Sequence, residues 1–274
     1  MHDIGTERRP SLLMRTLALP LLCLYLNGSA QSAEPASRDA VLTQHAQAAA
    51  ATLDSTQRAA LAVINDENRR NLAMTFYLRA GSNIQTRWAW SEERIEAYRQ
   101  SAESVAAQAE IAKISTRFAN DNPGYVLYTN TEVRNLELQL QRWQTVRSVG
   151  VAAAELRAAM LVELQKVDGR SDASAKRFRA FLIRWRASHP ITLAAPGLSL
   201  HGQGRAFDFQ VRDTKGRTIA GTDSATSASV WRRQGWADKV ERAIRAESTV
   251  FVGPLVRPDE PWHFEYRPAG ALAN

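Results

Sequence analysis

Two histidine-containing stretches near the carboxyl end combine residue types that could do chemistry together. The first reads SLHGQGRAFDF and covers residues 199 to 209, and the second reads EPWHFEY and covers residues 260 to 266. The chain has only five histidines, and His201 and His263 stand beside carboxylates in these stretches. Two neutral imidazoles and one carboxylate are a usual ligand set for a catalytic zinc, with a fourth position left for water. The two stretches thus predict a mononuclear zinc site.

The spacing between His201 and Asp208 requires the chain to fold back on itself. Seven positions correspond to about 10 Å along a helix and about 23 Å along a straight strand. Ligands of one zinc ion lie about 2 Å from it, so neither conformation suits a shared ion. Gly202 and Gly204 lie between the two residues, and glycine accepts backbone angles that are closed to other residues. We therefore expect a turn at these glycines.

The stretch after the turn has the alternation of a strand. In AFDFQV, Ala206, Asp208 and Gln210 point to one face and the apolar residues point to the other. A carboxylate buried on that face needs a cation or hydrogen-bond donors. For this stretch taken alone, a hairpin with an ordinary exposed Asp and His is an equal alternative.

The second stretch supplies the partner. Its alternation puts His263, Glu265 and Arg267 on one strand face, with the aromatic residues on the other. Pro261 stiffens the approach to this strand. Glu260, immediately before it, could reach a water in the site as a general base.

Taken together, the two stretches resemble the D-Ala-D-Ala metallopeptidases, which group with lysostaphin-type enzymes and the hedgehog pseudo-peptidase fold. The family pattern is Ser-x-His, then Gly-x-Ala-x-Asp, then Glu-x-x-His with Trp before the last His. The matching residues are Ser199, His201, Gly204, Ala206, Asp208, Glu260, Trp262 and His263. The resemblance covers about residues 123 to 268.

The resemblance implies roles for these residues. His201, Asp208 and His263 would bind one Zn²⁺ per chain, and Glu260 would be the catalytic base. Glu265 is the alternative base, or a partner that orients a metal ligand.

A substrate arginine is also implied. The family carries Ser-Gly-Tyr-Arg-Ser with a Gln five residues after the Arg, and NTEVRNLELQ resembles a divergent copy with Arg134 and Gln139 at that spacing. The residues at 131, 132, 133 and 135 depart from the pattern. Arg134 would stabilise charge on the scissile carbonyl, and Ser199 and Gln139 would bind substrate. Arg170 is the rival arginine, although no Gln follows it at the expected place.

The rest of the composition, with the resemblance, predicts an α+β fold. Residues 37 to 119 are rich in Ala, Gln, Glu and Arg, which favours helices, and Ser91 suits the start of one that runs to about residue 114. The segment YVLYT, residues 125 to 129, has the content of a strand. Helices are expected at 136–146, 149–167 and 174–189, and strand and loop follow Pro190. We expect a small antiparallel sheet that carries the site and is flanked by helices, with an extra helical amino-terminal region.

The amino terminus has the pattern of an export signal. Three arginines precede the apolar run LALPLLCLYL, and the small residues of NGSAQSA follow it. The run is too short to span a bilayer comfortably, so a cleaved signal is favoured over a retained anchor, which leaves no stable membrane insertion. Cys23, the only cysteine, lies in this run, so the mature chain has no disulfide. We expect a signal peptide at 1–33, a helical region at 34–119 and a catalytic domain at 120–274.

The formal net charge of +7 and the sequence pI near 9.9 favour anionic partners. The basic residues are scattered through helices without an aromatic-basic motif, which argues against nucleic acid. The resemblance implies a peptidoglycan peptidase of the periplasm or cell envelope, with stem peptides as substrates. D-alanyl-D-alanine carboxypeptidase is the first expectation, because PWHFEYRP most resembles that branch. An endopeptidase, or a zinc-fold module that binds wall peptides or a partner without turnover, stays open as an alternative.

Overall fold

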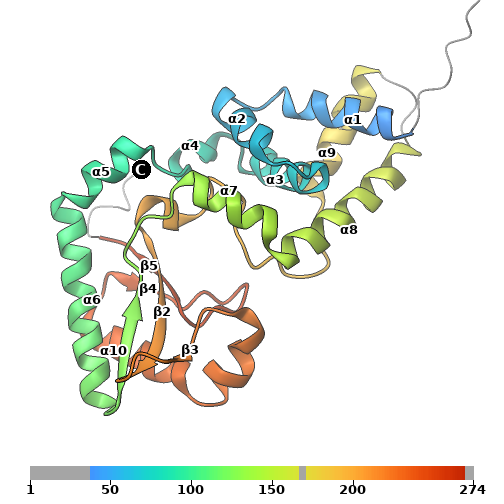
Figure 1. Ribbon diagram of the computed structural model, residues 1–274. Helices are drawn as coiled ribbons and strands as arrows, with labels where there is room; N and C mark the ends of the chain where they lie inside the picture. Colours follow the sequence, from blue (N-terminus) through green and yellow to red (C-terminus); the bar gives the residue numbers. More distant parts are fainter. Residues whose placement is uncertain (1–37, 167–170, 269–274) are drawn as a thin grey trace, which may run out of the picture. The chain divides into compact units, whose positions relative to one another are not determined.

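The computed structural model describes residues 38–166 and 171–268 of the chain (Figure 1). These residues belong to one unit, Ser37–Asn274. The expected signal peptide and the rival Arg170 lie outside the described residues. Within the described residues, no helix combines the length and apolar character needed to cross a membrane.

Helices precede and surround a small sheet. The helices are α1 (Arg38–Ala50), α2 (Ser55–Val63), α3 (Glu67–Ala80), α4 (Ile84–Arg87), α5 (Glu92–Arg99), α6 (Ala102–Asp121), α7 (Leu136–Thr145), α8 (Arg147–Leu164), α9 (Asp172–Arg184) and α10 (Trp236–Glu247). Shorter segments are η1 (Gly81–Asn83), η2 (Leu200–Gln203), η3 (Ser224–Thr226) and the π-helical η4 (Ser227–Arg232). The strands are β1 (Tyr125–Thr129), β2 (Ala206–Asp213), β3 (Thr218–Ala220), β4 (Phe251–Val252) and β5 (His263–Tyr266). This is an α+β fold, as expected.

The sheet is antiparallel, in the order β1-β2-β5-β4, and β3 pairs with β2. Figure 1 shows α6 and α10 beside it. The apolar face of β2 and β5 packs with these helices into one core that includes Phe207, Phe209, Phe264 and Trp236. The opposite face of the same strands is therefore left for Asp208 and His263.

A second core is mainly helical. It joins α1, α2 and α3 to α7, α8 and α9, with Leu72, Trp143, Leu156 and Phe178 fully buried in it. The indole N–H of Trp143 donates to the carbonyl of Arg69 at 3.1 Å. This core joins helices from both sides of residue 120, the expected boundary between the helical region and the catalytic domain.

Two expectations about elements were wrong. The helix starting at Ser91 is broken at residue 100, because Ser101 caps a new helix by accepting from the Ser104 N–H at 3.1 Å. The region after Pro190 contains the long helix α10, where we expected only strand and loop. Its buried residues, Trp236, Val240 and Ile244 among them, recur at helical spacing and face the sheet core.

Candidate metal centre

His201 reaches the site because the chain reverses immediately after it. The 3₁₀ turn η2 is followed by Gly204, which has a φ of +59° and so occupies the left-handed region that favours glycine. Gly202 is needed for a different reason. A Cβ on Gly202 would lie 2.4 Å from Gln139 Nε2 and 2.7 Å from the Cβ of Ala89. The expected turn at the two glycines is confirmed.

Residues of the helical amino-terminal region hold this turn in place. These contacts were not predicted from the sequence. Gln203 Nε2 donates to the carbonyls of Thr86 and Trp88 at 2.9 and 3.0 Å. The N–H of Trp90 donates to the carbonyl of Gly202 at 2.9 Å, and the Tyr98 hydroxyl donates to that of Gly204 at 3.2 Å. The closely spaced Trp88 and Trp90, between two helices, were the only sequence signal of a buried contact here.

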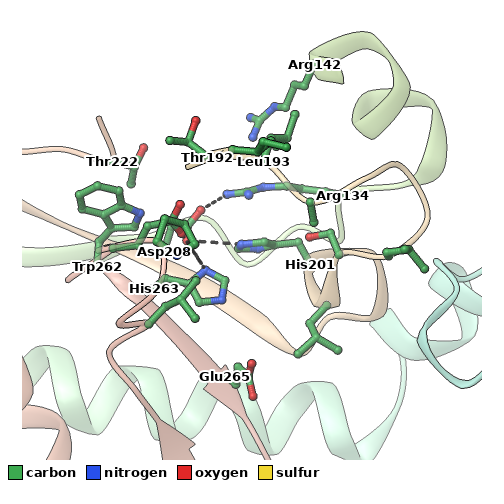
Figure 2. A pocket seen from close by; sticks show the side chains of 18 of the residues that line it. Arg134, Arg142, Thr192, Leu193, His201, Asp208, Thr222, Trp262, His263 and Glu265 are labelled. Atoms are coloured by element: carbon green, nitrogen blue, oxygen red, sulfur yellow. Dashed lines mark hydrogen bonds and ion pairs between the residues drawn. The ribbon is translucent and has the colours of Figure 1, made fainter. Parts of the chain in front are cut away.

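The register of β2 and β5 brings the other two residues together. Asp208 and His263 are direct cross-strand partners, and side chains in such pairs lie close on one face. Figure 2 shows His201, Asp208 and His263 converging from η2, β2 and β5. Residues 55 positions apart in sequence therefore meet through strand pairing.

The three side chains form a group that can hold a metal ion. Asp208 Oδ1 lies 3.3 Å from His201 Nε2 and 3.0 Å from His263 Nδ1. One ligand atom from each residue lies within 4.8 Å of the other two. Two ligands held about 2.0–2.1 Å from a tetrahedral ion are roughly 3.3 Å apart, so the spacing fits a single small ion. Convergence of the three predicted ligands is confirmed.

At His201 and Asp208 the local electrostatics favour the protonation states that metal binding needs. Burial lowers the pKa of His201, although Asp208 acts in the opposite direction. The lowered pKa favours the neutral imidazole. Burial alone would raise the pKa of Asp208. The hydrogen bonds to His201 and His263 and the charge of Arg134 outweigh it and hold that pKa well below its ordinary value.

Of the two acidic residues proposed as base, Glu260 is the one at the metal group. Its Oε2 lies 3.8 Å from His263 Nδ1, and burial raises its pKa to about 6. The N–H of Glu260 donates to the carbonyl of Leu255, and its own carbonyl accepts from the N–H of His263, which fixes the turn. Glu265 instead accepts two hydrogen bonds from Arg267, at 3.1 and 2.5 Å. Figure 2 draws no contact between Glu265 and the metal group.

Arg134 lies at the site, paired with a predicted metal ligand. Its guanidinium donates to Asp208 Oδ2, the oxygen that does not face the imidazoles. Its backbone is fixed on both sides: the N–H donates to the carbonyl of His201 at 3.0 Å, and the carbonyl accepts from Gln139 Nε2 at 2.7 Å. Arg134 therefore orients Asp208 and also faces the cleft.

The two expected substrate-binding residues differ in position. Ser199 lines the cleft beside the metal group. Gln139 is buried, and its amide is used by the main chain, since its oxygen accepts from the N–H of Gly197 at 2.9 Å while its nitrogen bonds Arg134. Gln139 therefore fixes the main chain at Gly197 and at Arg134. The structure does not support a direct contact of Gln139 with substrate.

The metal group lies in a cleft with a volume of about 830 Å³. Its walls come from α3, α7, the 185–200 segment, the polar face of β1 and β2, and the 255–265 segment. This volume lies within the range of about 300–1,000 Å³ that is usual for ligand-binding clefts.

We compared the chain with protein-family models, curated proteins and solved structures, and none of the three comparisons found a match. The resemblance to D-Ala-D-Ala metallopeptidases therefore depends on the site residues themselves.

Proposed function

We propose that this chain is a zinc-dependent peptidase of bacterial cell-wall stem peptides, acting as a D-alanyl-D-alanine carboxypeptidase. The observation that carries the proposal is the His201, Asp208 and His263 group, which lines a cleft and has the Glu260 carboxylate beside it. The order of these residues along the chain is that of the family pattern.

The donor set supports zinc over other common ions. Two imidazoles and one carboxylate in a compact arrangement are typical of catalytic zinc, whereas calcium and magnesium prefer sites made of oxygen ligands. A zinc ion held there would activate water and polarise a carbonyl as a Lewis acid.

Glu260 is the proposed general base. It lines the cleft next to the ligands, and no Lys or Arg of the described residues forms an ion pair with it. In this role it accepts a proton from the attacking water and passes it to the leaving amine.

Arg134 and Ser199 are the proposed contacts to the substrate. The Arg134 guanidinium keeps further donors beyond its bond to Asp208 and can face the carbonyl oxygen as charge develops there. The Ser199 hydroxyl, which has no hydrogen-bond partner among the residues described, can bond the substrate backbone.

The charge of the chain suits the proposed substrate. A net charge of +7 raises the local concentration of an anionic polymer such as the cell wall. Together with the amino-terminal pattern, this supports action in the periplasm or cell envelope.

The test is incubation of the purified protein with defined stem peptides, with zinc and with a chelator, followed by mass analysis of the products. Release of the terminal D-Ala, abolished by chelator, is the expected result. Internal cleavage would identify an endopeptidase instead. Zinc binding without any product would identify a binding module and contradict the proposal.

A further inference from the structure

The cleft carries more positive charge than its own carboxylates can neutralise. Seven arginines line it, against the four carboxylates of Glu132, Asp208, Glu260 and Glu265. Three of these carboxylates are already paired with arginines, in the pairs Asp208 with Arg134, Glu132 with Arg99, and Glu265 with Arg267. The cleft therefore favours a ligand with negative charge.

Six of the arginines have no carboxylate partner among the described residues: Arg79, Arg87, Arg142, Arg186, Arg212 and Arg257. Arg79 and Arg186 donate to main-chain carbonyls of the 183–185 segment. Arg87, Arg142 and Arg257 are exposed, and their side chains form no hydrogen bond or ion pair in the described part of the chain. Arg212 differs from all of these because the sheet holds it in place.

Two contacts fix the Arg212 side chain. Its Cζ lies 3.5 Å from the centre of the Tyr128 ring, and one Nη donates to Gln210 Oε1 at 3.1 Å. Its Nε is covered and has no acceptor in the described residues. The guanidinium thus lies over an aromatic ring, while donors that the protein leaves unused remain on it. A guanidinium fixed in this way binds a carboxylate with little further loss of side-chain conformational entropy.

Arg212 lies on the same strand face as the metal group. Asp208, Gln210 and Arg212 alternate along β2, and Tyr128 stands opposite Gln210 on β1. The pairing of β2 with β3 shifts register between Val211 and Arg212, but the extra residue is on β3, so the alternation along β2 is kept. Four residues of strand correspond to about 13 Å, the length of three or four residues of an extended peptide.

We propose that Arg212, with Tyr128 and Gln210, forms a second recognition subsite that binds a carboxylate of an acidic peptide substrate. The inference rests on the proposed function, because it takes the cleft to hold a peptide. A carboxypeptidase leaves a single residue beyond the bond that it cuts. The acidic group therefore lies on the amino side of that bond, three or four residues away.

The test compares two fluorescently labelled peptides that end in D-Ala-D-Ala. One carries Glu at both the third and the fourth positions before the scissile bond, and the other carries Gln at both. Dissociation constants are measured by anisotropy on the full protein stripped of metal, so that hydrolysis does not interfere. We expect the wild type to bind the Glu peptide about tenfold or more tightly, the scale of one charge-assisted contact.

The variants assign this preference to Arg212. Arg212→Gln should abolish it, and Arg212→Lys should keep part of it, because lysine retains the charge without the planar fork. Arg257→Gln is the matched control, since it removes another arginine of the same cleft, and it should leave the preference intact. Circular dichroism and thermal unfolding establish that each variant is folded.

Several results would overturn the subsite: equal binding of both peptides by the wild type, no binding of either, an unchanged preference in Arg212→Gln, or an equal loss in Arg257→Gln. If Arg212→Gln fails to fold, the wild-type comparison and Arg212→Lys still decide. The two proposals fail separately. Discrimination without cleavage after zinc is restored contradicts the peptidase alone, and cleavage without discrimination contradicts the subsite alone.

Discussion

Asp208 uses both of its carboxylate oxygens, one toward the two imidazoles and one toward Arg134. Asp208→Asn keeps the shape but removes the charge that neutralises a bound cation. We expect zinc affinity to fall by at least about 100-fold, beyond the 10–100-fold typical of losing a residue that only orients a ligand. Competition with a chelating dye measures it, and Asp223→Asn, at an exposed acid outside the cleft, is the control. Unchanged affinity would exclude Asp208 as a ligand.

Glu260 and Glu265 make a matched pair for separating catalysis from binding. Glu260→Gln should lower kcat by about 100-fold or more while zinc still binds, because the side chain loses the ability to accept a proton. Glu265→Gln should change kcat little, since Glu265 is bonded to Arg267. Steady-state kinetics on a D-Ala-D-Ala peptide, with zinc content measured in parallel, check both. A reversed order would make Glu265 the base.

At the scale of elements, η2 is the segment that aligns His201. Gly202→Ala places a methyl group 2.4 Å from Gln139 Nε2 and 2.7 Å from Ala89, so the turn has to move. We expect a loss of about 1–3 kcal/mol in the free energy of unfolding, together with weaker zinc binding. Gly221→Ala, where the nearest atom is 3.3 Å away on Thr218, should do neither. Urea unfolding and zinc titration measure the two effects, and full retention of both in Gly202→Ala would contradict this account.

The 185–198 segment of the cleft wall is tied to α8 by a pH-sensitive contact. Glu155 accepts from Ser188 and bonds His189 Nδ1 at 2.9 Å. The hydrogen bonds from His189 and Ser188 lower the pKa of Glu155 to about 2, from an ordinary value of 4.5. A depressed pKa stabilises the fold above about pH 4.5, and that contribution is lost as the pH falls toward 2. When the pH is lowered from about 5 to about 3, the free energy of unfolding should therefore fall less in Glu155→Gln than in the wild type. Urea denaturation at each pH measures this difference. Glu137→Gln, at an exposed helix position, should follow the wild type.

Sequence reasoning succeeded where the determining pattern is local. The β-branched and aromatic content of residues 125–129 predicted β1, and alternation oriented Asp208 and His263 correctly, because a strand exposes alternate residues. It missed the contacts of Gln203 with Thr86 and Trp88, more than 100 residues away, which no local pattern announces. The buried amide of Gln139 is a similar case: its spacing from Arg134 was recognised, but its direction depends on where Gly197 packs.

At the scale of the whole molecule, the site depends on both cores. The sheet core supplies the strands that carry Asp208 and His263. The helical core fixes α7, which follows Arg134, and a smaller cluster of Trp90, Ile95, Tyr98 and Val133 lies against the turn of His201. Helices remote from the metal group thereby determine its geometry.

This dependence predicts that residues 120–274 do not form an independent catalytic domain. Without α1 to α3, that fragment would expose the buried faces of Trp143 and Phe178, which now contact Phe76 and His45 at ring distances of 6.1 and 5.3 Å. It would also lose the carbonyls that hold Gln203. Because a domain needs its own core to unfold cooperatively, we expect no sharp thermal transition in the fragment and zinc binding at least about tenfold weaker than in the full chain. Calorimetry of both proteins measures this. A fragment with a sharp transition and full zinc affinity would show that the helical region is an accessory and that the domain boundary lies near residue 120.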